Sequence, residues 1–373
     1  MLTIDKKHKC SGCGACFNAC PISCIEMKRD EEGFLYPVID KTQCIQCGLC
    51  ESICPIHNEH GKVEEKKTKT FACINKNEEI RMKSSSGGAF SAFAEYVLEN
   101  DGVVFGAGFN EKFMVCHQLC QSKDDLDKLR TSKYVQSSIG DTYEIAKQFL
   151  DDNRLVLFTG TSCQISGLKA FLRKEYENLI TQDVICHGVP SPAIWEKYID
   201  YKSQQENLKL TKVCFRDKST GWRKFSLATH YEDENGNEIA YKTKFTQEPY
   251  MNMFIFNKIL RPSCYKCHFK GTSRQADITL ADFWGCQFSN LTPEMNDNKG
   301  CSLVILQTEK GQQVFKQLTD KLLSVEVDPK KALKRNSMAI KSAIKSPRRR
   351  FAMKNINKIP FDKYIKRYGS KIV

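Results

Sequence analysis

Two cysteine-rich runs constrain this chain more than any other feature of its sequence. The first, KCSGCGACFNACP, covers residues 9–21, and the second, QCIQCGLCESICP, covers residues 43–55. The second run keeps the cysteine spacing of the first, so the two form an internal repeat. Their cysteines are Cys10, Cys13, Cys16 and Cys20 in the first run and Cys44, Cys47, Cys50 and Cys54 in the second.

Disulfides, zinc and iron-sulfur clusters are the three chemistries that use so many thiols. The sequence begins MLTIDKKHKC, without the apolar stretch of a secretory signal, and no apolar run approaches the ~20 residues that cross a bilayer. We therefore expect a cytoplasmic protein with no transmembrane segment. In that compartment its 19 cysteines stay reduced, which favours metal ligation over disulfides.

Each run has the spacing C-x2-C-x2-C-x3-C-P of bacterial two-cluster ferredoxins, in which the fourth cysteine serves the other cluster. Zinc sites usually pair two short knuckles and do not need three successive cysteines followed by C-P. We therefore predict an α+β ferredoxin-like domain over residues 1–57 with two [4Fe-4S] clusters. The predicted ligands are Cys10, Cys13, Cys16 and Cys54 for the first cluster and Cys44, Cys47, Cys50 and Cys20 for the second.

The rest of the chain divides by composition. Residues 58–70 are polar and charged without periodicity, which is typical of a linker. From residue 71 onward apolar strands alternate with amphipathic helices, which predicts a larger α/β domain over 71–328 with a mixed, partly parallel sheet. Strands are predicted at 102–109, 154–158 and 277–283, and helices at 87–100, 141–153 and 163–176.

Four cysteines of the larger domain form a second candidate metal site. Cys163 opens a predicted helix, where a thiol is biased toward thiolate, and Cys186 ends an apolar stretch that we interpret as a strand. Cys264 and Cys267 form a C-x2-C knuckle. The four could hold a third cluster, zinc would accept the same thiolates, and unrelated packing would explain Cys163 and Cys186. The residues alone leave these alternatives open.

The stretch KSSSGGAFSAF, residues 83–93, is a candidate phosphate site. Small hydroxyl residues and two glycines before a helix expose backbone N–H groups where the helix dipole favours an anion, although a plain helix start has the same letters. There is no G-x-G-x-x-G between strand and helix and no P-loop, which disfavours a standard dinucleotide fold or an NTPase.

The net charge of +13 comes from the segment 329–373, which holds 15 Lys or Arg and one acid. We expect a basic, partly helical tail there. Such tails are usually solvated or bind acidic partners, and ferredoxins are acidic, so we do not expect nucleic acid as a partner.

Eight stretches between about residue 70 and about residue 310 resemble the coenzyme F420 hydrogenase/dehydrogenase beta subunit family, in its form with an amino-terminal two-cluster ferredoxin. They are KSSSGGAFSAF, SKYVQSSIGD, LFTGTSCQISGLKAFL, NLITQDVICHGVPSP, FRDKSTGW, RPSCYKCHF, ADITLADFWG and GCSLVILQTEKG, in family order. The resemblance implies FAD beside a cluster in the large domain. It also implies that Cys163, Cys186, Cys264 and Cys267 are the ligands of a third [4Fe-4S] cluster.

The same resemblance implies the flavin contacts, with Lys133 as the catalytic candidate that steadies an anionic reduced flavin. The implied contacts are Ser85, Ser86, Gly87, Gly88, Lys133, Tyr134, Gln136, Ser137 and Thr161.

Together these features predict an iron-sulfur flavoprotein oxidoreductase. Clusters carry single electrons and hydride chemistry needs two, so a flavin would join them. The expected partners are a ferredoxin or another redox protein and a small-molecule hydride acceptor or donor, which is coenzyme F420 in methanogens. Relatives in bacteria without F420 often lie near polysaccharide genes, so the substrate stays open. The alternative is a non-catalytic electron-relay subunit of a larger redox complex.

Overall fold

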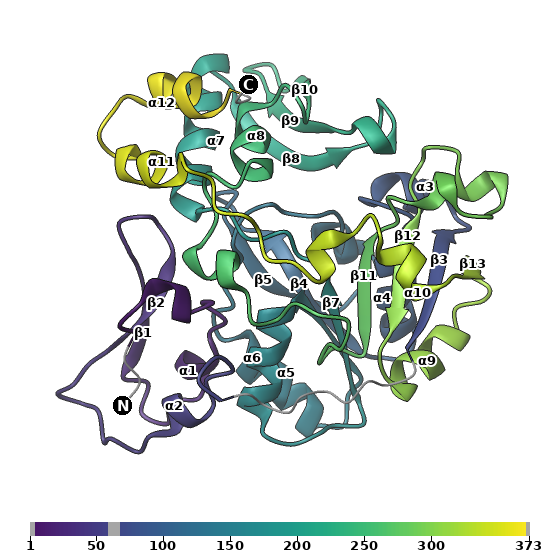
Figure 1. The fold of residues 1–373 in the computed structure, drawn as a ribbon, viewed down its shortest axis with the longest axis horizontal. Helices are drawn as coiled ribbons and strands as arrows, with labels where there is room; N and C mark the ends of the chain where they lie inside the picture. Colours follow the sequence, from purple (N-terminus) through teal and green to yellow (C-terminus); the bar gives the residue numbers. More distant parts are fainter. Residues whose placement is uncertain (1–3, 59–67, 371–373) are drawn as a thin grey trace.

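A computed structural model describes residues 4–58 and 68–370 of the chain (Figure 1). Most of the predicted linker, residues 59–67, lies outside the described residues. Strand β3 begins at Lys69, so the end of the segment predicted as linker is already part of the large sheet.

The N-terminal domain is small and built around its cysteines. Its two strands pair antiparallel, and each short helix begins after a glycine in the left-handed region, Gly14 at φ 79° and Gly48 at φ 73°. This arrangement confirms the predicted α+β fold. Its elements are η1 (Lys7–Lys9), α1 (Ala15–Asn18), β1 (Ile25–Arg29), β2 (Leu35–Ile39) and α2 (Leu49–Ser52).

The large domain is organised by an eight-stranded sheet of order β13-β3-β12-β11-β7-β6-β4-β5. The pairs β4–β6, β6–β7 and β7–β11 are parallel and the others antiparallel, which confirms the predicted mixed sheet. The strands are β3 (Lys69–Asn75), β4 (Val103–Phe109), β5 (Val115–Cys120), β6 (Val156–Thr161), β7 (Leu179–Val184), β11 (Ile278–Asp282), β12 (Ser302–Leu306) and β13 (Leu322–Glu326).

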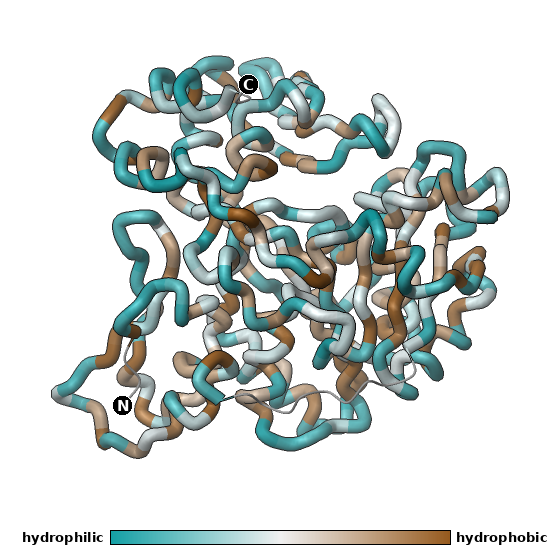
Figure 2. Tube along the Cα trace, in the orientation of Figure 1, coloured by the Kyte–Doolittle hydropathy of each residue, from teal (hydrophilic) through white to brown (hydrophobic). Residues whose placement is uncertain are grey.

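Helices cover both faces of this sheet because successive strand side chains point to opposite sides. Val103 and Phe105 of β4 pack in one cluster with α5 (Thr142–Asp151) and α6 (Ser162–Leu172). Val104 between them packs in another cluster with α4 (Ala89–Glu99) and α9 (Glu309–Lys316). Along the trace, hydrophilic segments predominate in the outer loops (Figure 2).

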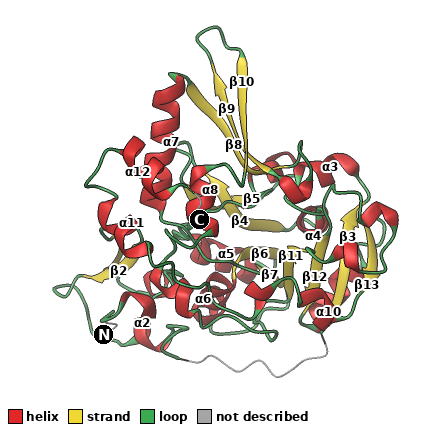
Figure 3. Cartoon of the chain, turned by 45° about the horizontal axis from the view of Figure 1, so that its top comes forward, coloured by secondary structure: helices red, strands yellow, loops and turns green. Residues whose placement is uncertain are grey.

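A three-stranded antiparallel sheet of order β10-β9-β8, which the sequence patterns did not reveal, projects from the large sheet (Figure 3). It packs with nearby helices around an aromatic core that includes Trp195, Phe215 and Tyr250. The elements of this part are α7 (Pro192–Glu206), β8 (Lys209–Asp217), β9 (Ser226–Glu232), β10 (Glu238–Lys244), α8 (Pro249–Ile255), α11 (Arg349–Asn355) and α12 (Phe361–Tyr368).

The basic C-terminal segment packs against the rest of the protein. Tyr364, Ile365 and Tyr368 of α12 are buried in the same aromatic core. The other helices are α3 (Glu78–Lys83) and α10 (Pro329–Leu333). No helix in the described part of the chain combines the length and apolarity needed to cross a bilayer.

Candidate functional site

The cysteines of the twin runs line two separate cavities of the N-terminal domain. Each cavity takes three cysteines from one run and the fourth from the other. Cys24, outside the repeat, is buried beside the second cavity with its Sγ 3.5 Å from that of Cys20. The first cavity holds Cys10, Cys13, Cys16 and Cys54, and the second holds Cys44, Cys47, Cys50 and Cys20.

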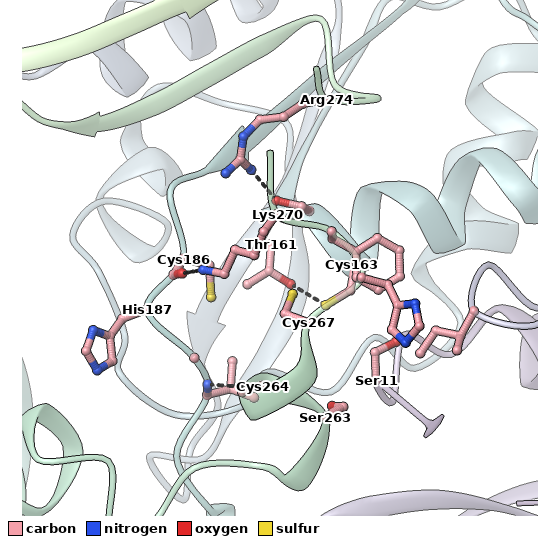
Figure 4. A pocket seen from close by; sticks show the side chains of 16 residues that line it. Ser11, Thr161, Cys163, Cys186, His187, Ser263, Cys264, Cys267, Lys270 and Arg274 are labelled. Atoms are coloured by element: carbon pink, nitrogen blue, oxygen red, sulfur yellow. Dashed lines mark hydrogen bonds between the residues drawn. The ribbon is translucent and has the colours of Figure 1, made fainter. Parts of the chain in front are cut away.

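A third cavity, beyond the carboxyl ends of β6 and β7, is lined by Cys163, Cys186, Cys264 and Cys267 (Figure 4). Cys163 is the second residue of α6, and the knuckle lies in and just after the 3-10 helix η4 (Pro262–Lys266). The prediction that a strand ends at Cys186 is wrong, since β7 ends at Val184 and Cys186 lies in the loop that follows.

Backbone and hydroxyl groups hold the thiols of this third cavity. The N–H of Val189 donates to Cys264 Sγ at 3.4 Å, and Thr161 Oγ1 is 3.1 Å from Cys163 Sγ. Burial raises the pKa of the Cys264 thiol to about 12, so metal binding there would release a proton.

A segment from the C-terminal part of the chain lies over the knuckle. Ser342 Oγ accepts from the N–H of Cys267 at 3.0 Å, and the carbonyl of Ala339 accepts from the N–H of Gly271 at 2.9 Å. Lys270 joins the two layers, because its ammonium donates to the carbonyls of Cys186 and Met338.

The donor set of all three cavities suits a cluster better than a single ion. Four thiolates per cavity are the ligands of a [4Fe-4S] cubane. In the described ranges, 4–58 and 68–370, no three His, Cys, Asp or Glu side chains converge closely enough to hold one metal ion. His187, beside Cys186, contacts Asn257 Oδ1 through Nε2 at 2.6 Å, and its ring is turned away from the sulfurs (Figure 4).

The first and third cysteine-lined cavities are neighbours. Ser11 and Ile56 of the N-terminal domain line the third cavity together with its four cysteines. Tyr143 Oη lies 2.8 Å from the carbonyl of Cys13 and 2.7 Å from that of Gln164 in α6. The second cavity is therefore the outer one of the three.

A cavity of about 480 Å³ opens at the carboxyl ends of the parallel strands β6, β7 and β11. This is where ligands bind in open α/β sheets, and the volume is in the range of small-molecule sites. Of the predicted flavin contacts, this cavity is lined by Ser85, Ser86, Gly88, Lys133, Tyr134, Ser137 and Thr161.

Gly87 and Gln136 do not line the cavity, in contrast to the other predicted contacts. A Cβ at Gly87 would stand 2.3 Å from the carbonyl oxygen of Cys73, so glycine is needed there for close packing against the sheet. The Gln136 amide instead accepts from Arg261 at 3.0 Å and donates to the carbonyl of Ser11 at 3.3 Å.

The amino end of α4 contributes backbone donors to the cavity. Gly88, at φ 86°, precedes the helix, and no side chain caps the first helical N–H groups from this position. Gly88, Ala89 and Phe90 line the cavity. The Ser85 hydroxyl is already engaged, since it accepts from the N–H of Ser132 at 2.7 Å. The helix start, more than the serine hydroxyls, is therefore suited to an anionic group.

Among the described residues that line the cavity, Lys133 is the one lysine. Its Nζ donates to the carbonyls of Arg130 at 2.7 Å and Lys128 at 2.9 Å. Burial lowers the pKa of this ammonium to about 7, so its charge changes close to neutral pH.

His117 is a cavity residue that sequence reasoning missed. Its Nε2 lies 2.9 Å from the carbonyl of Thr159, which can only accept, so we assign the proton to Nε2 and let Nδ1 accept from Ser137 Oγ at 2.8 Å. Burial lowers the pKa of this imidazole to about 4, so the ring is neutral at neutral pH.

Arg216 was also missed, and it joins three walls of the cavity. It forms a bidentate ion pair with Asp282, with N···O distances of 2.8 Å and 3.0 Å. It also donates to Tyr134 Oη at 3.0 Å and to the carbonyl of Ser85 at 3.1 Å. Trp222 Nε1 donates to the same carboxylate at 2.8 Å. Burial opposes the charge of Arg216, but the neighbouring Asp282 carboxylate outweighs it and raises the pKa of Arg216, so the guanidinium stays charged. Arg216 lies in the stretch FRDKSTGW, which resembles the family, but the sequence gives it no role.

The cavity fits an aromatic cofactor with an anionic part. It combines apolar walls with the open amino end of α4, a titrating lysine and a fixed arginine. A flavin nucleotide has this chemistry, and Thr161, Lys133, Tyr134 and the start of α4 are the groups that would hold it.

Three cysteine-lined cavities and the twin C-x2-C-x2-C-x3-C-P runs define the class as iron-sulfur proteins. Residues 9–58 match the model of the 4Fe-4S dicluster domain. Residues 70–142 match the amino-terminal model, and residues 153–331 the carboxyl-terminal model, of the coenzyme F420 hydrogenase/dehydrogenase beta subunit. The chain belongs to this oxidoreductase subunit family, and the resemblance noted from its motifs is confirmed.

One solved structure similar to this chain is described as xenon derivatization of the F420-reducing [NiFe] hydrogenase complex from Methanosarcina barkeri. The matching chain is 17% identical with a TM-score of 0.45, and the match covers 72% of this chain and 89% of that one. No curated protein matches this chain.

Proposed function

We propose that this chain is an iron-sulfur flavoprotein oxidoreductase that passes electrons between ferredoxin-type [4Fe-4S] clusters and FAD. The observation that carries the proposal is the position of Thr161, which stands in the wall of both the third cysteine-lined cavity and the 480 Å³ cavity. A flavin beside a cluster supplies both one-electron and hydride chemistry when bound.

The residues of the large cavity have separate tasks in this proposal. The start of α4 binds phosphate, and Lys133 supplies a positive charge that is available near neutral pH. His117 remains neutral, and Arg216 fixes the positions of Tyr134 and the Ser85 backbone relative to Asp282. The carboxylate of Asp282 thereby stays paired and does not repel an anionic ligand.

The basic C-terminal segment supports an acidic redox protein, such as a ferredoxin, as the electron partner. The segment that lies over the knuckle, residues 338–342, and the stretch after it carry four exposed basic residues, Lys341, Lys345, Arg348 and Arg350. Positive charge at this place would speed the encounter with an acidic partner and make it dependent on salt. The two-electron partner is a small hydride acceptor or donor, which is coenzyme F420 or another small molecule such as one used in polysaccharide biosynthesis.

Anaerobic purification followed by iron, zinc and flavin analysis tests the proposal. We expect about twelve irons and one flavin per chain, since each cluster holds four irons. About eight irons would remove the third cluster from the proposal. A zinc-loaded preparation without flavin would contradict it as a whole.

A turnover assay then separates an enzyme from a relay subunit. Reduced ferredoxin is supplied, and reduction of F420 or NAD(P)⁺ is followed by absorbance. Turnover of a small acceptor is expected. A chain that holds clusters and flavin but reduces none of these acceptors would be an electron-relay subunit whose chemistry takes place in a partner.

A further inference from the structure

Arg261 is a fully buried cation at the contact between the N-terminal domain and the large domain, with 0% of its surface exposed. Its Nε donates to the carbonyl of Cys10 at 2.9 Å, and its terminal nitrogens donate to the Leu35 carbonyl at 2.9 Å and to Gln136 Oε1 at 3.0 Å. The guanidinium lies 4.2 Å from the ring centre of Tyr36.

None of these partners carries a negative charge. Other buried arginines are paired with carboxylates, Arg216 with Asp282 at 2.8 Å and Arg274 with Asp183 at 2.8 Å. Within the described residues, no Asp or Glu oxygen lies within 4 Å of Arg261. A buried cation without a counter-charge is strongly unfavourable, so its position indicates an anionic group nearby.

The candidate for that group is the first cysteine-lined cavity. A terminal nitrogen of Arg261 lies 3.6 Å from Cys10 Sγ and donates to it. Gly12, in the same loop, leaves room for the guanidinium, because a Cβ there would stand 2.9 Å from the Arg261 terminal nitrogen. A [4Fe-4S] cluster with four thiolate ligands is an anion and becomes more negative on reduction.

We propose that Arg261 is the counter-charge of the cluster held by Cys10, Cys13, Cys16 and Cys54, and that it raises the reduction potential of that cluster. A positive charge and an N–H···S hydrogen bond both favour the reduced, more negative state. The proposal rests on the proposed function, which supplies the cluster.

Among the described residues, the second cluster site has no equivalent of Arg261. No arginine or lysine of the described ranges donates to the sulfur of Cys20, Cys44, Cys47 or Cys50, whereas Arg261 donates to Cys10 Sγ. The two halves of the repeat share their ligand spacing, but only the first is in contact with the large domain through this arginine. Arg261 should therefore affect one cluster and leave the other unchanged.

The test compares R261Q and R261K with wild type in the full chain, purified anaerobically. A redox titration followed by electron paramagnetic resonance gives the potential of each cluster. In R261Q we expect the ratio of reduced to oxidised form of one cluster to fall about tenfold at a fixed solution potential. For a one-electron couple this corresponds to a potential lower by ~59 mV. In R261K, which keeps the charge, the shift should be less than about threefold, and in both variants the potential of the cluster held by Cys44, Cys47, Cys50 and Cys20 should not move.

R349Q is the matched control. Arg349 is also buried at this domain contact, where it pairs with Glu32 at 2.6 Å and donates to the carbonyl of Leu260, but among the described residues it has no hydrogen bond to a cysteine. Its removal should leave all the potentials unchanged. An equal shift in R349Q would show that any loosening of the contact moves the potential, and would overturn the proposal.

The remaining outcomes also decide the question. An unshifted potential in R261Q with full iron contradicts the role of Arg261, and so does a shift in R261K as large as that in R261Q. If R261Q loses the iron of one cluster, retention in R261K supports a charge role, whereas loss in both variants contradicts it. Absence of iron from the wild-type chain would instead refute the proposed function.

Discussion

Gly167 of α6 lies directly against Cys13, so that a Cβ at position 167 would stand 2.9 Å from the Cβ and 3.1 Å from the Sγ of Cys13. The N-terminal cysteine loop thus approaches the same helix that carries Cys163 near its start. A glycine permits this approach where any other residue would push the loop away.

The variant G167A tests this contact. Alanine favours a helix over glycine by about 1 kcal/mol, but overpacking costs about 1–3 kcal/mol. We expect a net loss of stability on urea unfolding and a loss of the iron of one cluster. K169A, in the same helix, should unfold within about 0.5 kcal/mol of wild type. A G167A chain with full iron and wild-type stability would show that the loop yields without cost.

The pH dependence of flavin binding should report on Lys133. The pKa of this ammonium is lowered to about 7, so the charged form dominates below pH 7 and the neutral form above it. An anionic ligand prefers the charged form. The dissociation constant of FAD should therefore rise by up to about tenfold per pH unit above 7. Fluorescence titrations from pH 6 to pH 9 measure it.

Variants at two neighbouring lysines complete that experiment. In K133M the dissociation constant should be higher than that of wild type at pH 6 and should change little with pH. K128M removes an exposed lysine whose side chain pairs with Asp125, and should behave as wild type. Parallel profiles for wild type and K133M would rule out a contact between Lys133 and the ligand.

Acid stability should report on His117. Its pKa is about 4 in the folded protein, below the usual value of 6.5, so the unfolded chain takes up a proton first as the pH falls. The stabilising contribution of the neutral ring is complete above pH 6.5 and lost as the pH falls toward 4. Between pH 7 and pH 5 wild type should lose about 2 kcal/mol more than H117Q in urea unfolding. Equal losses in the two proteins would mean that the ring is charged or exposed.

Substituting only one partner of the ion pair of Arg216 and Asp282 should lower the stability of the protein strongly. Removing one partner of a buried pair leaves the other charge uncompensated and costs about 3–5 kcal/mol, so D282N should be far less stable than wild type. R29M breaks the exposed pair of Arg29 with Glu196 and should cost less than about 1 kcal/mol. The double variant R216M/D282L should be more stable than the sum of its single variants predicts, and simple additivity would contradict the pairing.

Much of the large sheet could be predicted because its strands and helices have regular patterns. The predicted helices at 87–100, 141–153 and 163–176 are α4, α5 and α6. The first two are shorter at both ends, whereas α6 begins one residue earlier, at Ser162, and ends at Leu172. The strand β7 was placed too far along the chain because its second half is polar. Gln182 and Asp183 are buried, and Asp183 is held there by Arg274 at 2.8 Å, which no local pattern reveals.

The site divides in the same way. The N-terminal cysteines share a fixed spacing, so their grouping follows from short segments of sequence. Arg216 and Arg261 act through partners distant in sequence, such as Asp282 for the first and Cys10 for the second. Their importance appears only when the fold brings those segments together.

The cover of the third cavity by residues 338–342 has a consequence for how the protein is made. These residues leave the ribosome some seventy positions after Cys267, yet they supply acceptors to Cys267, Lys270 and Gly271. The N-terminal pair of cluster sites can form early in synthesis, whereas the third site stays open to the surroundings until this late segment arrives. For the cluster proposed at that site, this order predicts that insertion precedes the docking of the segment that ends at Ser342.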